Sequence, residues 1–335
     1  MKKLNLKSLL RSESLILFVV VLLGLTALSL VSGQFLKTFN LYVLVYNIAL
    51  ATLVAFGQMV VVATGGMNIS LGAIGGLSAV LAAMLMEWYG WPLWLIIPVT
   101  LAGGALMGFI NGFLAVKTGI SPFVITLATA SAFTGASMAI TNANPIYGVY
   151  DSVLSLGQAR WGIFPWPALA AIAVAGGLAT WFHRTTSGRQ VLALGANRTA
   201  AQLTGVPIGR RLIQVHVVSG FIASIAGFLT MARVEAGSPT IGNQWLLPGF
   251  AALVIGGVLL EGGRIAIVGV ILGVTILELI SNALAISHTD PFWVDLLQGA
   301  LVLVAVILGQ ARKRVVAAGR RLPQEALTAS SLGGK

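Results

Sequence analysis

Long apolar segments separated by short polar breaks form the dominant pattern of this chain. Continuous runs of roughly twenty apolar residues suit helices that cross a hydrocarbon core of about 30 Å. Strands of a membrane barrel would instead alternate over segments of about ten residues. The pattern predicts ten spans, at 15–33, 41–63, 66–86, 93–116, 122–140, 164–182, 212–232, 248–260, 265–286 and 292–309. The third begins with the broken stretch GGMNIS and the eighth is short, so we expect either to be partial or re-entrant.

Composition supports an all-α polytopic membrane protein and excludes an ordinary soluble domain. The mean hydropathy is +0.95, and 57% of the residues are hydrophobic while 9% are charged. A soluble domain carries about 25% charged residues. The 40 glycines fit this class, because small residues let membrane helices approach closely.

The positive charge is distributed as the topology of a membrane protein requires. If the N-terminus is cytoplasmic and all ten spans cross, 17 of the 20 lysines and arginines lie inside, and only Lys37, Arg160 and Arg233 lie outside. The prediction is a cytoplasmic segment 1–14, one transmembrane domain 15–310 and a basic cytoplasmic tail 311–335. The net charge of +11 therefore reports orientation in a lipid bilayer rather than a nucleic-acid partner.

The largest predicted inner loop, residues 183–211, looks soluble between long apolar segments. It carries five arginines, including Arg184 and Arg211, and no acidic residue. Asn197 is a good N-cap, so a short helix over residues 198–204 that ends at Gly205 is expected outside the bilayer. Such a helix suits contact with another protein, and a plain solvated loop is the alternative.

The stretch GGMNISLGAIGG, residues 65–76, joins the second and third spans. Its glycines permit backbone conformations that other residues avoid, and Asn68 with Ser70 can cap the helix that follows. A broken helix at membrane depth can meet a polar solute. A tight hairpin whose glycines serve packing explains the stretch equally well.

Two further groups of polar residues lie inside predicted spans. Asn111, Thr126 and Thr129 occupy the hairpin 108–140, where hydrogen bonding between helices competes with solute contact as the explanation. Thr275, Glu278 and Asn282 share one face of the ninth span. An intramembrane carboxyl by default suggests function, as a solute acceptor or coupled proton site, although a structural bond to a neighbouring helix is the alternative. His216, near the start of the seventh span, is interpreted as a packed or interfacial histidine.

Several chemistries are excluded by residue content and spacing. The chain has no cysteine, and its three histidines lack the spacing of metal ligands. No segment fits the phosphate-binding pattern G-x-x-x-x-G-K-[ST], since Val116 precedes the only Lys-Thr pair. No serine, histidine and acid combine into a catalytic set. We therefore expect a chain that is not an enzyme and binds no cofactor or metal, so that any ATP and Mg²⁺ must be used by another chain.

Four ordered motifs resemble the permeases of binding-protein-dependent ABC importers of the ribose and autoinducer-2 type, the branched-chain and ribose permease family. They are the segment from LGANRTAAQLTG into the next span, GGMNISLG (GGIDLSVG in the family), GFINGFLAVKTGISPFVITLAT, and IGGVLLEGGRIAIVGVILG. The match as a whole runs from about residue 45 to 310, and the motifs follow the family's order.

The resemblance implies a ten-helix permease of the type II, vitamin B12-importer-like architecture in a bacterial cytoplasmic (inner) membrane. It implies a second identical or different permease, two ATPase subunits or one double-domain ATPase, and an extracytoplasmic solute-binding protein. The solute would be a sugar or similar small polar molecule, passed by alternating access. The resemblance makes the short loop helix the ATPase-coupling helix, with the residues Asn197, Arg198, Ala200, Ala201 and Gly205. The candidate substrate pathway comprises Asn68, Ser70, Asn111, Thr126, Glu278 and Asn282.

Three positions depart from the family pattern. Asn68 replaces its Asp, Glu278 stands where a small or apolar residue is common, and Gln298 stands where a lysine is frequent. Glu278 also supports the alternative hypothesis, a secondary transporter or facilitator driven by an ion gradient. The two hypotheses differ in whether an ATPase must bind the loop.

Overall fold

The computed structural model describes residues 13–287 together with 293, 296, 299, 300 and 303. In this part of the chain the long helices are α2 (Glu13–Val31), α3 (Thr38–Val62), α4 (Leu71–Glu87), α5 (Leu93–Thr118), α6 (Pro122–Thr141), α8 (Pro167–Arg184), α11 (Ile208–Val234) and α13 (Ile267–Ile286). The shorter ones are α7 (Asp151–Gln158), α9 (Thr186–Ala196), α10 (Arg198–Leu203) and α12 (Leu246–Ile255). Strands β1 (Arg160–Trp161) and β2 (Phe164–Pro165) form a two-residue antiparallel hairpin.

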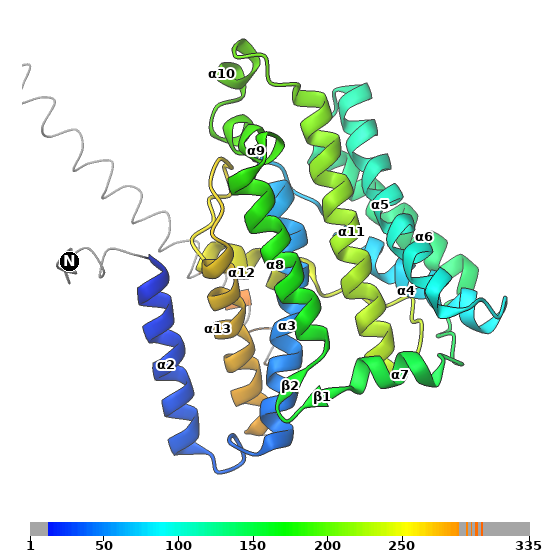
Figure 1. Ribbon diagram of the computed structural model, residues 1–335, viewed down its shortest axis with the longest axis vertical. Coiled ribbons are helices and arrows are strands. Elements are labelled where there is room, and N and C mark those ends of the chain that lie inside the picture. The colour runs from blue at the N-terminus through cyan, green and yellow to red at the C-terminus, as the bar shows by residue number, and fades with distance from the viewer. Residues whose placement is uncertain (1–12, 288–292, 294–295, 297–298, 301–302, 304–335) are drawn as a thin grey trace, which may run out of the picture.

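Nine of the ten predicted spans coincide with described helices, and the tenth, 292–309, lies mostly outside the described residues. Six helices of the described part are long and apolar enough to cross a membrane. Helix α9 and helix α7 were expected as loop, so the sequence missed both. Figure 1 shows α9 and α10 at one end of the bundle and α7 with the β-hairpin at the opposite end.

Helix α11 is the centre of the bundle and packs against α3, α4 and α5. Glycines at every fourth position of α5, namely Gly104, Gly108 and Gly112, face it. A Cβ atom on Gly108 would overlap the backbone carbonyl of His216, and one on Gly104 would lie 2.6 Å from the carbonyl oxygen of Gly220. This small-xxx-small pattern brings the two backbones into contact, which compensates for the weak hydrophobic drive between helices in lipid.

The predicted eighth span, 248–260, is wrong at its C-terminal side because α12 ends at Ile255. A Cβ on Gly256 would collide with the backbone of Gly269 in α13, and Gly257 has a φ of 78°, so the chain turns there. The ten residues of α12 rise roughly 15 Å, about half of the hydrocarbon core. A helix of this length is therefore too short to cross the hydrocarbon core alone.

A non-helical stretch that consists mostly of turns, residues 236–245, precedes α12. Gly237 pairs with Ile146 beside the α7 end, and Gly242 lies against the backbone of Gly72 at the start of α4. The stretch before α12 therefore packs against the first turns of α4. Non-helical backbone at membrane depth is tolerated where protein surrounds it. Both helices are shorter than the predicted spans, since α4 begins only at Leu71 and α12 ends at Ile255.

Candidate functional site

The broken segment before α4 is the centre of a buried hydrogen-bond network. Asn68 and Ser70 are both fully buried. The Asn68 Oδ1 atom accepts from the Ser70 amide at 3.1 Å and the Ser70 hydroxyl at 2.8 Å, and Asn68 Nδ2 donates to Ser219 Oγ of α11 at 2.9 Å. Gln58 Nε2 of α3 donates to the Asn68 carbonyl at 2.8 Å. The prediction that these two side chains cap α4 is wrong. Asn68 bonds instead to Ser70 and Ser219, and the Ser70 side chain makes no cap bond.

The same network extends to α5 and α6. Asn111 Nδ2 donates to Ser70 Oγ at 2.7 Å, and Thr129 Oγ1 donates to Asn111 Oδ1 at 2.6 Å. The amide of Ile69 donates to Thr126 Oγ1 at 3.1 Å. Four of the six candidate pathway residues, Asn68, Ser70, Asn111 and Thr126, therefore lie together. They bond to one another in this conformation, so solute contact would require some of these bonds to open.

Two polar groups beside this network have no hydrogen-bond partner among the described residues. They are Oε1 of Gln58 and both ring nitrogens of His216, a fully buried residue one turn before Ser219 on α11. His216 is therefore a packed histidine, as predicted. Buried polar atoms are nearly always paired, so this layer of α3 and α11 has unused hydrogen-bonding capacity next to the network.

Glu278 and Asn282 belong to a separate cluster. Asn282 exchanges two amide hydrogen bonds with Asn40, of 3.2 and 2.9 Å, at the first turn of α3. Asn40 and Gln58 are eighteen residues apart on α3, or roughly 27 Å along its axis. The structure thus divides the six candidates into two groups at different depths.

Glu278 is half-buried on α13 and lies within electrostatic reach of Arg233 on α11. Arg233 donates to Asn47 Oδ1, and its guanidinium lies 4.4 Å from the ring centroid of Tyr46. The third residue of the predicted polar face, Thr275, donates to the carbonyl of Ile271 within its own helix. On this polar face of α13, the Asn282 amide therefore bonds to α3 and the Glu278 carboxyl lies near the Arg233 guanidinium.

The predicted short helix in the inner loop is confirmed as α10. Asn197 Oδ1 accepts from the Ala200 amide at 3.0 Å, and Gly205, with a φ of 77°, ends the segment. Ala201 is buried, whereas Leu203 is 84% exposed. Leu203 is therefore the large apolar side chain that α10 leaves exposed. Sequence reasoning did not single out Leu203, although it is the one leucine of the expected helix.

Helix α10 is connected to the network through a junction of glycines. A Cβ on Gly195, in the last turn of α9, would overlap the carbonyl oxygen of Ala63, which accepts from the Gly263 amide at 3.0 Å. Gly262 lies against Gly65 at the same point. The end of α9, the end of α3 and the α12–α13 loop therefore meet backbone to backbone. Residue 65 is the first residue of the segment that contains Asn68. Helix α9 therefore packs against the chain directly before the network.

A bundle of apolar helices long enough to cross a bilayer is typical of a polytopic membrane protein, and the described residues contain no cluster that could hold a metal ion. Residues 40–306 match the family of branched-chain amino acid transport system permease components, and the chain belongs to that family. It is therefore a permease component and not an enzyme, as the sequence predicts.

Individual relatives agree with this assignment. The chain is 32% identical over 294 residues to the ribose import permease protein of Bacillus subtilis, covering 87% of this chain and 90% of the relative. It is 32% identical to the fructose import permease protein of Rhizobium meliloti, covering 91% and 88%. It is 34% identical to the D-allose transport system permease protein of Escherichia coli, covering 84% and 86%. The family resemblance seen in the four motifs is thereby confirmed.

Proposed function

We propose that this chain is the membrane-spanning translocation subunit of an ATP-driven importer for a sugar or sugar-like solute. The names of its relatives as ribose, fructose and D-allose permeases support the solute class. A separate ATPase uses ATP and Mg²⁺, and an extracytoplasmic binding protein delivers the solute. Two permeases and two ATPase domains form the complex in a bacterial inner membrane, with both termini and α10 on the cytoplasmic side.

The observation that carries the proposal is the position of α10. Its exposed Leu203 faces away from the bundle, while α9 behind it is fixed by Gly195 to the base of α3. A partner that seats α10 in a groove can therefore move the end of α3 and the segment that holds Asn68. Such movement biases two arrangements of the bundle, as alternating access requires.

The test is binding and uptake with a single charge placed on α10. Leu203→Asp puts a carboxylate where we expect an apolar contact, so co-purification of the cognate ATPase and ATP-dependent uptake should both be lost. Leu36→Asp is the matched control, because Leu36 is 60% exposed in the α2–α3 turn at the opposite end of the bundle. Uptake into proteoliposomes that contain this chain without an ATPase would contradict the proposal.

A further inference from the structure

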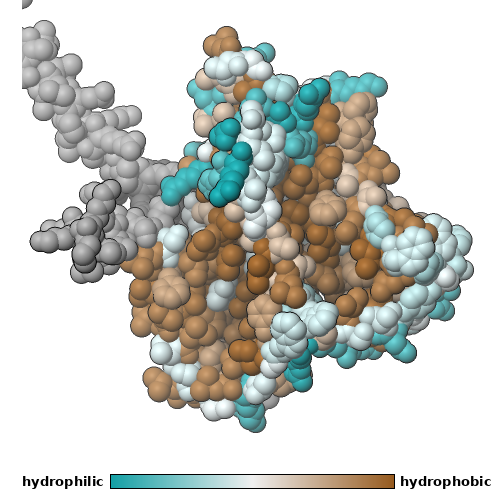
Figure 2. Space-filling view, in the orientation of Figure 1, coloured by the Kyte–Doolittle hydropathy of each residue, from teal (hydrophilic) through white to brown (hydrophobic). Residues whose placement is uncertain are grey.

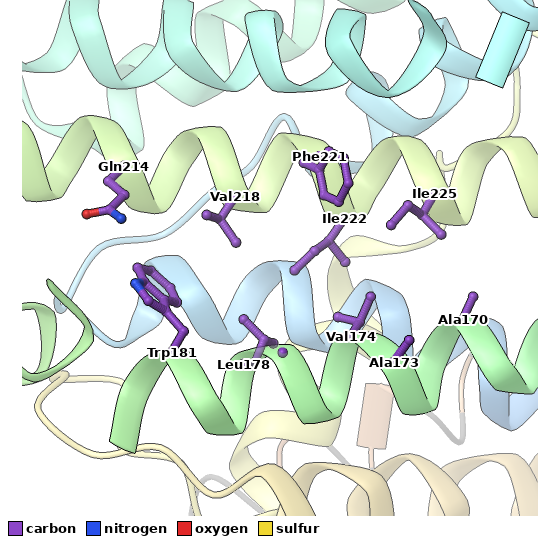
Figure 3. Close-up of a pocket in the computed structure, with 11 residues that line it drawn as sticks. Ala170, Ala173, Val174, Leu178, Trp181, Gln214, Val218, Phe221, Ile222 and Ile225 are labelled. Atoms are coloured by element: carbon purple, nitrogen blue, oxygen red, sulfur yellow. The ribbon is translucent and has the colours of Figure 1, made fainter. Parts of the chain in front are cut away.

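A long apolar groove runs between α8 and α11 (Figure 3). Its volume is about 660 Å³, and its walls include Leu178 of α8 with Val218 and Ile222 of α11. From Gln214 at one end to Ile225 at the other, α11 rises roughly 16 Å. That length is about half of the 30 Å hydrocarbon core and matches the tails of one lipid leaflet.

The groove opens to the outside of the bundle. Ala173 and Gly177 on its α8 wall are exposed, and Phe221 on the opposite rim is 40% exposed. Small residues along α8 leave space that larger side chains would fill. Figure 2 shows the middle of this face of the molecule as largely hydrophobic, with hydrophilic residues at the α9–α10 end and at the opposite end. In a bilayer the open side of the groove faces hydrocarbon tails.

One end of the groove is polar and positively charged. At this end helix α9 contacts both α8 and α11. Trp181 donates its indole N–H to Ser187 Oγ at 2.9 Å there. Arg211 donates to Oε1 of Gln190 at 2.8 Å and of Gln214 at 2.7 Å. Both acceptors are neutral, so these bonds orient the guanidinium without cancelling its charge.

Further arginines flank this end. Arg184 is the last residue of α8, Arg210 precedes Arg211, and both are exposed. The sequence from residue 183 to 211 contains no aspartate or glutamate. The groove therefore combines an apolar channel one leaflet long with a cationic end, and a tryptophan lies where the two meet.

We infer that this groove is a binding site for an anionic phospholipid, with one acyl chain between α8 and α11 and the phosphate headgroup at Arg211. The apolar walls match a hydrocarbon chain in length and chemistry. Basic pockets between membrane helices bind acidic headgroups, and arginine forms strong charge-assisted hydrogen bonds with phosphate. Tryptophan at the polar end matches the preference of its amphipathic ring for the membrane interface. The site is separate from the Asn68 network and does not depend on the transported solute.

Two adjacent glycines provide a matched pair of variants for the acyl-chain part. Gly177 lines the groove, Gly176 does not, and a Cβ on either would meet no atom within 4 Å. Gly177→Leu therefore fills the groove, whereas Gly176→Leu adds the same side chain to the same helix outside it. Native mass spectrometry of the detergent-purified chain, titrated with phosphatidylglycerol, measures binding. We expect wild type and Gly176→Leu to bind alike and Gly177→Leu to bind about tenfold more weakly, because displaced methylene groups lose their burial.

The headgroup part is tested by changing one charge. Arg211→Gln should weaken phosphatidylglycerol binding about fivefold and leave phosphatidylcholine binding unchanged, since one arginine near a membrane surface contributes about 1 kcal/mol. Arg160→Gln, at the opposite end of the bundle, should change neither. Equal binding of both lipids by wild type, or equal loss in the two glutamine variants, would overturn the headgroup assignment.

A third measurement remains informative if Gly177→Leu does not fold. The chain has no cysteine, so Val218→Cys gives one site within the groove for a fluorescent label. Bromine atoms on the acyl chains of phosphatidylglycerol should quench this label strongly in vesicles. Unquenched fluorescence would show that a protein segment or a second copy of the chain covers the groove, and the inference would be wrong.

Discussion

At the residue scale, Asn111 links three elements of the buried network. Its amide donates to Ser70 and accepts from Thr129, and the side chain is fully buried. Asn111→Ala leaves both hydroxyl groups with one partner fewer, which we expect to cost about 1–3 kcal/mol. Thermal unfolding in detergent should show a midpoint lower by several degrees. Asn144→Ala removes an exposed amide and should leave the midpoint unchanged, and equal midpoints for the two variants would contradict the network's structural role.

Glu278 distinguishes the two transport hypotheses. If ATP drives import, Glu278→Gln should retain ATP-dependent uptake at a rate close to wild type, because Arg233 keeps its contacts with Asn47 and Tyr46. If the carboxyl couples transport to an ion gradient, the variant should lose uptake driven by that gradient. Uptake by reconstituted complexes, measured with ATP or with an imposed proton gradient, decides between these outcomes.

The sequence predicted the residues of the network better than their arrangement. Asn68 and Ser70 were singled out by their place in a glycine-rich break. Asn111 and Thr126 were singled out by their polarity within apolar spans, because uncompensated polar groups are expensive there. The sequence could not separate these four residues from Glu278 and Asn282, since depth depends on where each helix begins and ends. Ser219 and Gln58 were missed because single polar residues within spans have no local pattern.

At the scale of elements, the junction beneath α9 brings backbones so close that it has no room for an added methyl group. Gly195→Ala places a methyl group against the Ala63 carbonyl, and the backbone on both sides must shift. Overpacking of this kind costs about 1–3 kcal/mol and should displace α9 from the base of α3. We expect the reconstituted complex to hydrolyse ATP while moving less solute for each ATP consumed.

Gly176→Ala is the control for this prediction. Both glycines lie in helices, so alanine raises helix propensity by a similar amount, about 1 kcal/mol, at each position. At position 176 the added methyl group meets nothing within 4 Å. An unchanged ratio of solute moved to ATP hydrolysed in Gly195→Ala would show that α9 transmits no movement at this contact.

The lengths of the apolar segments were enough to predict the long helices. The places where the backbones of two segments touch could not be predicted from the sequence. The junction joins residues 63, 195 and 263, which come from three distant segments, and glycine is too frequent in this chain for its positions to identify partners. Helix α9 was missed because its glycines, Gly188 and Gly195, looked like breaks. Both instead serve close packing, since a Cβ on Gly188 would overlap the backbone of Trp181.

At the scale of the whole molecule, the bundle has two ends that we expect on opposite faces of a membrane. The long helices connect the α9–α10 end with the α7 end, and the non-helical stretches before α4 and α12 lie between the two ends. The distribution of lysine and arginine in the sequence predicts that the α9–α10 end lies in the cytoplasm. Both the coupling proposal and the expected delivery of solute depend on this orientation.

Single cysteines can establish the orientation because the natural chain contains none. Thr199 on α10 and Ser152 on α7 are both exposed, so cysteine at either position should react with a maleimide that reaches it. With a membrane-impermeant maleimide, Ser152→Cys should label in intact spheroplasts and Thr199→Cys only after lysis, because the reagent cannot cross the bilayer. A permeant maleimide, which should label both variants in intact spheroplasts, controls for reactivity. The reverse labelling pattern would place α10 outside, where no cytoplasmic ATPase could reach it.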